Sequence, residues 1–308
     1  MPHATIRLLF PLAFNPLNKL LIFGVGLIGG SLALALKRAH AVQHVVGIGR
    51  PGDNLQPALD LGVIDEATHD IAAALVDTDM VVIATPVAQI PLILTAIAPH
   101  LKPHTVVTDV GSTKSDVIHH ARAALPMHFE RFVAGHPIAG AEKSGAAAAH
   151  PDLFQSRNVV LTPLTETSPH ALDAVSRMWQ AAGANICRMD AETHDGIFAA
   201  VSHLPHLLAF ALVDELSRRA NAEQLFDFAA SGFRDFTRIA GSSPEMWRDI
   251  SLANRDALLS ELDAYQHELE QMRALLQQRD GAGLQALFER ASSARNAWSA
   301  NKNTDPAV

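Results

Sequence analysis

The sequence predicts an α/β fold in which a doubly wound, mostly parallel sheet is followed by an all-helical domain. Two observations lead to this prediction. Short runs rich in valine and isoleucine alternate with helical patterns up to about residue 189, and no strand pattern follows them. Such alternation is typical of βαβ units whose sheet is buried on both faces. A chain of 308 residues is long enough for two domains.

Six apolar runs in the first half are predicted to be strands, since each is rich in branched residues and ends at glycine, proline or threonine. In chain order they are KLLIFG, HVVGIG, MVVIATP, TVVTDVG, RFVAG and NVVLTP. The segments between them, such as Leu27–Ala39 and Ala88–Ala98, are rich in alanine and leucine and begin at glycine or proline turns. We therefore expect helices in these segments.

After Asp190 the sequence has only helical patterns. The stretch from Ala191 to Ala220 predicts a long helix that is kinked or restarted near Pro205, because proline lacks the amide hydrogen that a helix uses. Further helices are expected from about Leu225, from Pro244 through Arg279, and over Leu284–Ser299. Many positions in these helices are apolar, so we expect the domain to bury them against a second copy of the chain.

Charge and composition exclude several classes of protein. The net charge of −8 is spread along the chain, which argues against binding to nucleic acid or to anionic membranes. Cys187 is the only cysteine, so no internal disulfide forms and a reducing compartment suits the chain. No apolar run approaches the ~20 residues of a membrane span, and Pro11 interrupts the short apolar run near the N-terminus. We expect a cytoplasmic protein.

A glycine pattern typical of nucleotide binding lies between the first predicted strand and the first helix. Gly24, Gly26 and Gly29 have G-x-G-x-x-G spacing. The first glycine would allow a tight turn, the second would let a pyrophosphate approach the backbone, and the third would let helix and strand pack closely. The helix amides that follow, at Leu27 and Ile28, would bind the phosphates. The sequence therefore predicts a Rossmann-type dinucleotide site.

The residues after the second strand bear on the choice of cofactor. An NAD site usually has an acidic residue there to bind the ribose hydroxyls. In this chain Gly49 and Arg50 occupy those positions, and a guanidinium can pair with a ribose 2′-phosphate, so the sequence favours NADP. Asp53 lies close by and keeps NAD open as the alternative.

Two further turns follow predicted strands at the edge where ligands bind in this fold. One contains Thr85 and Pro86, and the other runs from Asp109 through Gly111 to Ser112. We expect cofactor contacts from both turns.

Four more motifs combine with the glycine pattern: TDVGSTK (Thr108–Lys114), GHPIAGAEKSG (Gly135–Gly145), SHLPH (Ser202–His206) and GFRDFTRIAGSSPEMWRDI (Gly232–Ile250). Together they closely resemble the prephenate/arogenate dehydrogenase family of tyrosine biosynthesis, from about Lys19 to about Gln278. The resemblance implies a Rossmann-type domain followed by an all-helical dimerisation domain, and hence a homodimer. Periodicity alone predicts the same order of domains.

The resemblance also implies a reaction. The family removes hydride from the ring carbon that carries a hydroxyl, while the ring carboxylate leaves as carbon dioxide. His136 matches the histidine of the G-H-P motif and would accept the hydroxyl proton. Ser112 would hold the hydroxyl and the imidazole in line, and the glycines near His136 would let substrate and nicotinamide approach. Prephenate and arogenate both fit, and a dual-substrate cyclohexadienyl dehydrogenase is a further alternative.

A substrate with two carboxylates requires cations or strong donors. By resemblance, Arg238 would hold the ring carboxylate through its guanidinium, and Asp235 could orient that arginine. His206 would point into the substrate pocket, and His194 and His203 match positions near it.

Two other residues are matched by the resemblance alone. Glu142 follows the G-H-P motif, where the family uses an acid in gating or in contact across the dimer. Trp247 matches a tryptophan that closes over the substrate from the helical domain.

The predicted organisation has four parts. An N-terminal extension covers residues 1–18 and a dinucleotide-binding domain covers residues 19–189. A helical substrate and dimerisation domain covers residues 190–282, and a C-terminal helix with a tail covers residues 283–308.

Three other readings of the chain remain to be weighed. A metal-dependent hydrolase could use His194, His203 and His206, but no acidic ligand stands at helical spacing and we predict no metal. A non-catalytic dinucleotide sensor would leave the G-H-P histidine without a role. A β-hydroxyacid dehydrogenase would need a catalytic lysine in the helical domain, and the chain has none between Lys143 and Lys302.

Overall fold

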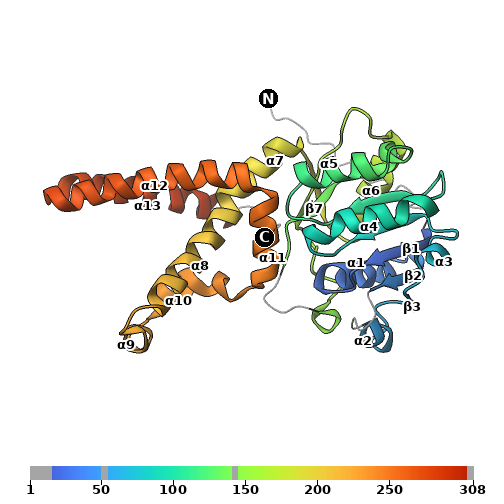
Figure 1. Ribbon diagram of the computed structural model, residues 1–308, viewed down its shortest axis with the longest axis horizontal. Coiled ribbons are helices and arrows are strands. Elements are labelled where there is room, and N and C mark those ends of the chain that lie inside the picture. Colours follow the sequence, from blue (N-terminus) through green and yellow to red (C-terminus); the bar gives the residue numbers. More distant parts are fainter. Residues whose placement is uncertain (1–15, 50–54, 141–144, 304–308) are drawn as a thin grey trace, which may run out of the picture.

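The computed structural model describes residues 16–49, 55–140 and 145–303. Most of the expected N-terminal extension, residues 1–15, lies outside this range. The described chain has a sheet-containing half and a helical half, which lie beside each other (Figure 1). The last strand ends at Arg188 and the first helix of the helical half begins at Ala191.

The main sheet has six parallel strands, five of which are runs that the sequence predicts to be strands; the strand Glu66–Thr68 is the exception. They are β1 (Leu17–Phe23), β2 (Val42–Ile48), β3 (Glu66–Thr68), β4 (Met80–Ile83), β5 (Val106–Asp109) and β6 (Phe132–Val133). Their order in the sheet is β3-β2-β1-β4-β5-β6, and all neighbours run parallel. β2 and β3 therefore lie on one side of β1, and β4, β5 and β6 lie on the other. Open α/β sheets bind ligands at the point where the strand order reverses in this way, here between β1 and β4.

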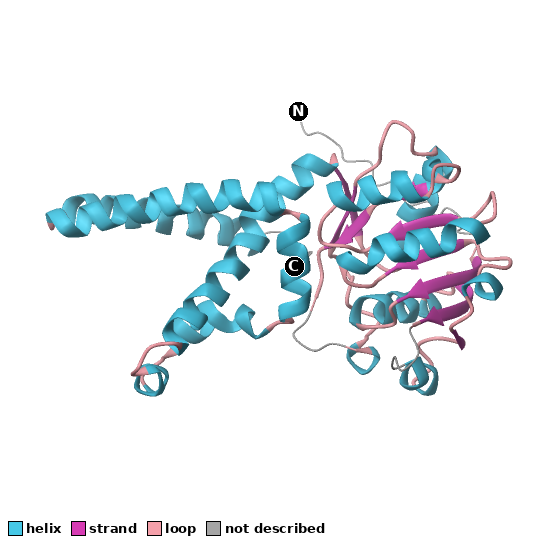
Figure 2. Cartoon of the chain, viewed as in Figure 1, coloured by secondary structure: helices cyan, strands magenta, loops and turns pink. Residues whose placement is uncertain are grey.

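Helices cover both faces of this sheet (Figure 2). They are α1 (Leu27–Arg38), α2 (Leu55–Asp60), α3 (Ile71–Ala74), α4 (Ile90–Ile97), α5 (Ser115–Ala124) and α6 (Pro169–Ala181). The sheet half also has short 3-10 turns: η1 (Val87–Gln89), η2 (Ala98–His100), η3 (Phe129–Arg131) and η4 (Ala146–Ala148). One core cluster includes the buried rings of Phe154 and Trp179 from the α6 side, and a second includes Ile90 and Leu94 of α4. Both faces of the sheet are therefore apolar and buried, which explains why its strands are continuous valine and isoleucine runs.

A second, three-stranded sheet corrects one sequence prediction. It contains β7 (Gly135–Pro137), β8 (Asn158–Leu161) and β9 (Asn185–Arg188). β8 is the NVVLTP run, which was expected in the main sheet, and it pairs antiparallel with β7 and parallel with β9. The antiparallel pairing places His136 opposite Val160. The G-H-P motif therefore lies on β7, in the second sheet.

The helical half starts with one long helix of 27 residues. It consists of α7 (Ala191–Phe198), a π-helical segment η5 (Ala199–His203) and α8 (Leu204–Ser217). The predicted disturbance near Pro205 is this π segment, which immediately precedes the proline-containing first turn of α8. Single π turns inside helices are frequent at functional sites.

The remaining helices of this half are α9 (Ala222–Asp227), α10 (Ser231–Thr237), a 3-10 turn η6 (Arg238–Gly241), α11 (Pro244–Ala253), α12 (Arg255–Gln278) and α13 (Gly281–Asn303). The single helix expected from Pro244 through Arg279 is in fact broken at Asn254. α11 packs against η1 of the sheet half, while α12 and α13 lie side by side and project away from it (Figure 1).

The helix from Ala191 to Ser217 also corrects the expectation about apolar runs. By length and composition it could cross a membrane, although only 22% of its most apolar window is buried within the chain. Its exposed large side chains include Ile197 and Val201. Further exposed apolar side chains occur elsewhere in this half, among them Phe228, Leu269, Leu276 and Phe288. One copy of the chain therefore leaves a large apolar surface uncovered on the helical half.

Candidate active site

The turn between β1 and α1 has the shape that a dinucleotide pyrophosphate requires. Gly24 has a φ of +87°, and an added Cβ would lie 2.6 Å from the backbone oxygen of Ala84. An added Cβ on Gly29 would lie 2.4 Å from the backbone oxygen of Gly24. A Cβ on Gly26 would meet no atom within 4 Å. The three positions therefore have the predicted geometry: a tight turn, close helix packing and open space at Gly26.

Donors surround this open space. α1 begins at Leu27 and Ile28, and the first amides of a helix have no acceptor within the helix. Thr85 follows β4, and its methyl group lies 3.0 Å from the Cβ that Gly24 lacks. The buried hydroxyl of Thr85 has no hydrogen-bond partner among the described residues. The side chain of Pro86 is exposed beside it. The turn fits a bound dinucleotide.

Both residues that bear on the choice between NAD and NADP, Arg50 and Asp53, lie outside the described residues. What is described is the end of β2 next to them. His69 Nδ1 lies 2.7 Å from the backbone oxygen of Gly49, and since that oxygen can only accept, the imidazole donates. The preference for NADP therefore stays a prediction.

The side chain of Asp109 is bound by other residues of the protein, and the predicted cofactor contact of this residue stays a prediction. The carboxylate is fully buried and forms an ion pair with the equally buried Lys114. It also accepts the amide of Gly111 at 2.7 Å and the amide of Gly135 at 3.1 Å. A Cβ on Gly111 would lie 2.9 Å from this carboxylate, so the glycine gives the turn room to fold over it. Asp109 thus holds the turn and the strand that carries His136.

Gly135 is expected to leave room for substrate and nicotinamide, but the space where its Cβ would lie is bordered by other residues of the protein. A Cβ there would lie 3.1 Å from the backbone oxygen of Asp109 and 3.3 Å from Leu161, so the glycine lets β7 pack against its neighbours. Its carbonyl accepts Lys114 Nζ at 2.7 Å. Only Gly140, whose Cβ would meet nothing within 4 Å, has the open surroundings predicted for both glycines near His136.

His136, His194 and Asp195 form a hydrogen-bonded series that joins the two halves of the molecule. His136 Nδ1 lies 2.8 Å from His194 Nε2, and His194 Nδ1 lies 2.8 Å from Asp195 Oδ1. Asp195 also accepts the backbone amides of Lys114 and Ser115, each at 2.8 Å. His194 has no exposed surface and both of its ring nitrogens have protein partners, so it lies behind His136. Its predicted contact with substrate stays a prediction.

The surroundings keep both imidazoles neutral. Burial, followed by the positive charge of Lys114, holds the pKa of His136 well below its ordinary value of 6.5. Burial also lowers the pKa of His194, although its hydrogen bond to Asp195 opposes this effect. Burial raises the pKa of Asp195, but hydrogen bonds from His194, Ser115 and Lys114 outweigh it, so the net pKa is lowered. Asp195 is therefore a carboxylate beside two neutral rings.

A second buried polar group lies next to this series. The amide nitrogen of Asn254 donates to the backbone oxygen of Asp195 at 2.8 Å and lies 3.1 Å from His203 Nδ1. Since that amide nitrogen can only donate, His203 Nδ1 accepts and its Nε2 carries the hydrogen. His203 Nε2 is buried without a partner among the described residues, and burial lowers the pKa of His203 to about 4.

The structure brings His206 and Trp247 together, and their role in a substrate pocket stays a prediction. Their rings stack at 3.6 Å between centroids, with an angle of 19°. Burial lowers the pKa of His206, and the nearby charge of Arg238 lowers it further. The buried indole nitrogen of Trp247 has no partner among the described residues, and its ring lies 6.1 Å from that of His203. This face therefore offers several donors and one guanidinium.

The other predicted site residues have less defined places. Asp235 is exposed on α10, one turn before Arg238. Glu142 lies outside the described residues. Ser112 lies half-buried in the turn after β5. The Nδ1 of His136 is held by His194, so Ser112 is not the residue that orients this nitrogen; its contact with the substrate hydroxyl stays a prediction.

Four residues of the site were not singled out from the sequence: Lys114, Asp195, Phe198 and Asn254. Lys114 stands in the quoted motif TDVGSTK, and Asp195 directly follows His194. The ring of Phe198 lies 4.8 Å from that of His136 and 4.5 Å from that of His194, so it covers both imidazoles. Residue type could have drawn attention to the first two, but nothing in the sequence marks Phe198 or Asn254.

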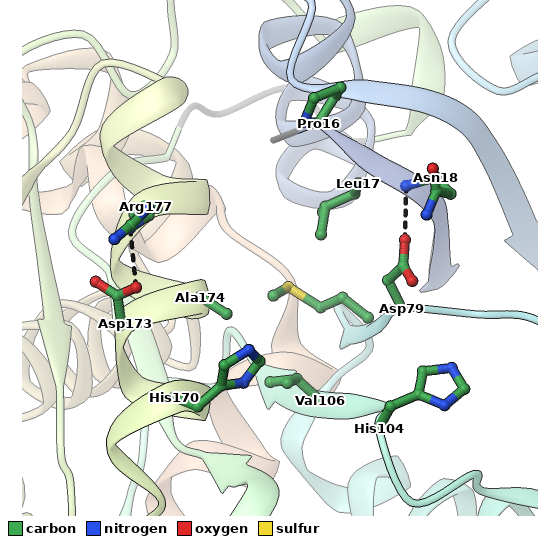
Figure 3. A pocket seen from close by; sticks show the side chains of 11 residues that line it. Pro16, Leu17, Asn18, Asp79, His104, Val106, His170, Asp173, Ala174 and Arg177 are labelled. Atoms are coloured by element: carbon green, nitrogen blue, oxygen red, sulfur yellow. Dashed lines mark hydrogen bonds and ion pairs between the residues drawn. The ribbon is translucent and has the colours of Figure 1, made fainter. Parts of the chain in front are cut away.

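Two cavities differ in their position relative to His136, His194 and Asp195. One of about 350 Å³ lies at the opposite, amino-terminal edge of the main sheet, where Asn18, Asp79, His104, His170, Asp173 and Arg177 line it (Figure 3). Its polar groups partly satisfy one another, since Asp79 accepts the amide of Asn18 and Arg177 pairs with Asp173. A second cavity, of about 510 Å³, is bordered by Asp195 and Asn254. The outer end of the hydrogen-bonded series therefore lies near an opening.

The arrangement of the histidines does not suit a metal-dependent hydrolase. His194 uses one ring nitrogen for Asp195 and the other for His136, so it has none left for a metal. Among the described residues, no group of three or more histidine, cysteine or acidic side chains could hold a metal ion.

Both halves of the chain match known protein families. Residues 32–188 match the family described as prephenate dehydrogenase, nucleotide-binding domain. Residues 190–290 match the family described as prephenate dehydrogenase, dimerization domain.

Individual relatives agree with these matches. The chain is 39% identical to a prephenate dehydrogenase of Bacillus subtilis over 281 residues, which cover 91% of this chain and 76% of the relative. A crystal structure of prephenate dehydrogenase from A. aeolicus, in complex with hydroxyphenyl propionate and NAD+, superposes with a TM-score of 0.85 at 36% identity, covering 91% of this chain and 98% of that one. A Synechocystis arogenate dehydrogenase superposes with a TM-score of 0.76 at 30% identity, covering 91% and 99%.

Proposed function

The chain belongs to the prephenate dehydrogenase family, and on that premise we propose that it catalyses the NAD(P)-dependent oxidative decarboxylation of prephenate or arogenate. The observation that carries this proposal is the position of His136: a half-buried imidazole, kept neutral by its surroundings, on a strand that Asp109 ties to the turn after β5. A base that is neutral at working pH is what an alcohol oxidation requires.

The role of His136 follows from the hydride, the proton and the carboxylate that the reaction removes from the substrate. When bound in the glycine turn, the dinucleotide would accept hydride from the hydroxyl-bearing ring carbon. As that carbon becomes a carbonyl, His136 takes the hydroxyl proton. Loss of the ring carboxylate as carbon dioxide then makes the ring aromatic and turns the carbonyl oxygen into a phenolate. The phenolate regains the proton from the imidazolium, so His136 ends the cycle neutral.

Substrate binding falls to the face formed by Arg238, His206 and Trp247. A guanidinium can bind a carboxylate with two parallel hydrogen bonds, so Arg238 holds the ring carboxylate. The stacked rings of His206 and Trp247 form an apolar wall for the ring of the substrate. The unpaired donors at His203 Nε2 and Trp247 Nε1 suit polar atoms of a bound ligand. Ser112 donates or accepts at the ring hydroxyl, Asp235 orients Arg238, and Glu142 gates the site.

The working unit is a homodimer formed through the helical half. The apolar surface of the α8, α12 and α13 region supports this, because a single chain leaves Leu269, Leu276 and Phe288 exposed. The domain division that we propose is a dinucleotide-binding domain over residues 19–189 and a helical domain over 190–282, with α13 packed along α12. Burial in this dimer would explain why the helix Ala191–Ser217 is apolar, and no membrane is needed for it. A cytoplasmic location is consistent with such a dimer.

The preferred cofactor is NADP, because Arg50 rather than an acid follows the second strand. The measurement is kcat/KM for NAD and NADP with wild type and with Arg50→Ala. We expect the variant to lose more NADP use than NAD use. A strong preference of wild type for NAD would make Asp53 the ribose ligand instead.

The proposed reaction itself is tested with purified protein, each of the two substrates, and each of the two cofactors. Formation of reduced cofactor together with 4-hydroxyphenylpyruvate, or with tyrosine, is the expected result. Binding of a cofactor without turnover of either substrate would favour the dinucleotide sensor.

A further inference from the structure

We propose that His194 and Asp195 are positioning residues that fix the protonated nitrogen of His136 and receive its positive charge during the reaction. This inference rests on the proposed function for its kinetic consequences, but its structural part concerns the protein without substrate. It begins from four hydrogen bonds: two backbone amides donate to Asp195, one bond joins His194 to Asp195, and one joins His136 to His194.

The direction of the series is set at Asp195. Its two oxygens accept the backbone amides of Lys114 and Ser115, and an amide nitrogen can only donate. Both oxygens of Asp195 accept hydrogens, and its pKa is lowered, so the side chain is an ionised carboxylate. An ionised carboxylate can only accept a hydrogen from its third partner, His194. His194 Nδ1, at 2.8 Å, therefore carries a hydrogen.

The next two bonds follow from the first. A neutral imidazole has one donor and one acceptor nitrogen, so His194 Nε2 accepts. Its partner at 2.8 Å is His136 Nδ1, which must then donate. His136 Nε2 is left without a hydrogen, and this is the nitrogen that can take the substrate proton. The carboxylate at the far end of the series thus decides which nitrogen of His136 is the base.

The same hydrogen bonds can move the positive charge from His136 to His194. A proton on His136 Nε2 would create a cation that faces the buried ammonium of Lys114, with neutral His203 also nearby. If the Nδ1 proton moves along the 2.8 Å bond to His194 Nε2, His136 becomes neutral again. The positive charge then lies on His194, directly beside the carboxylate of Asp195. No proton is gained or lost, and the Asp109 carboxylate remains paired with Lys114 throughout.

The surroundings favour this role over a purely structural one. His194 has no exposed surface and Asp195 is 5% exposed, while Phe198 covers both imidazole rings. Water therefore competes little for the hydrogen bond between the two histidines, whereas Asp195 borders the cavity of about 510 Å³. Hydrogen bonds within a low-dielectric site are stronger than in water.

The test combines a spectroscopic and a kinetic readout. Nitrogen-15 NMR of the imidazole rings, assigned with single histidine variants, reports which nitrogen carries the hydrogen in the protein without substrate. At neutral pH we expect both His136 and His194 to carry it on Nδ1. Asp195→Ala removes the acceptor of the His194 Nδ1 hydrogen, so the series loses its fixed direction and His136 should populate the Nε2–H form. The turnover of that variant with prephenate should fall by about 10²–10⁴-fold, the scale of a wrongly set tautomer.

Two further variants distinguish a positioning role of this series from a general effect on folding. Asp190→Asn changes an exposed aspartate that caps the same helix, so it should alter neither the tautomers nor kcat. His194→Gln can still accept from His136 but cannot take a proton; we expect the Nδ1–H form of His136 to remain, kcat to fall, and KM and cofactor affinity to stay within a few-fold. Thermal unfolding and cofactor binding check that Asp195→Ala is folded.

An Nε2–H form of His136 in wild type, or unchanged kcat in His194→Gln, would overturn the inference. An inactive wild type with both rings in the Nδ1–H form would instead count against the proposed function alone.

Discussion

Lys114 and Asp109 form an ion pair in which neither side chain has any exposed surface. Around it, Asp109 accepts two amides and Lys114 donates to the carbonyl of Gly135. The pair therefore ties the turn after β5 to the strand that carries His136. Its ammonium also contributes to the low pKa of that histidine.

Removing only the lysine should destabilise the protein strongly. Lys114→Met leaves the Asp109 carboxylate buried without its cation, and breaking a buried pair in this way typically costs about 3–5 kcal/mol of unfolding free energy. The double variant Lys114→Met with Asp109→Asn keeps an acceptor for one of the two amides and removes the unpaired charge. We expect it to recover part of the loss in chemical denaturation. A double variant as unstable as the single one would contradict this account.

The two glycines Gly26 and Gly29 give a matched pair of alanine variants. A Cβ at Gly26 meets no protein atom, so Gly26→Ala should fold normally but obstruct the pyrophosphate and weaken cofactor binding. A Cβ at Gly29 would overlap the backbone of Gly24, so Gly29→Ala should lose about 1–3 kcal/mol of stability through overpacking. Calorimetric binding and thermal unfolding of both variants test this, and equal cofactor affinity for wild type and Gly26→Ala would remove the pyrophosphate from this turn.

Arg238 should act on the substrate and not on the cofactor. Arg238→Gln removes one charged partner of a carboxylate, which commonly costs about 2–5 kcal/mol, so KM for prephenate should rise about thirtyfold or more. Arg234→Gln, one turn earlier on α10 and also exposed, is the matched control and should leave KM unchanged. If KM stays constant in Arg238→Gln while the dimer dissociates, this arginine is structural.

His203 should make stability depend on pH. Its folded pKa of about 4 lies below the ordinary 6.5, so the unfolded chain binds the proton more readily. The stability from the neutral ring is present above pH 6.5 and is lost as the pH falls toward 4. Between pH 7 and pH 5, wild type should lose about 2 kcal/mol more than His203→Asn, whose side chain can accept from Asn254 but cannot titrate. Parallel pH dependences of the two proteins would show that His203 does not titrate in this way.

The sequence predicts the main sheet well because its strands are buried on both faces and hence appear as apolar runs. It misses β3 (Glu66–Thr68) and β9 (Asn185–Arg188), which are short and partly exposed, so they lack that pattern. It also places β8 in the wrong sheet, because strand partners depend on tertiary packing that a local run does not encode.

The site shows the same division. His136 and the glycine turn belong to local motifs, and both could be found from spacing. The contacts of Asp195 with Lys114 and Ser115 join residues that lie 81 and 80 positions apart, and no local pattern indicates such pairs. The positioning of His136 is therefore visible only in the folded chain, although the histidine itself is visible in the sequence.

The central claim is that His136 takes the substrate proton, and the turnover of His136→Asn with prephenate tests it most directly. Asparagine keeps a polar side chain of similar size but cannot accept the proton, so kcat should fall by about 10²–10⁴-fold while KM and cofactor affinity stay within a few-fold. In wild type, kcat/KM should fall only as the pH drops through a value below 6.5, in line with the lowered pKa of His136. Turnover of His136→Asn close to that of wild type would contradict the claim.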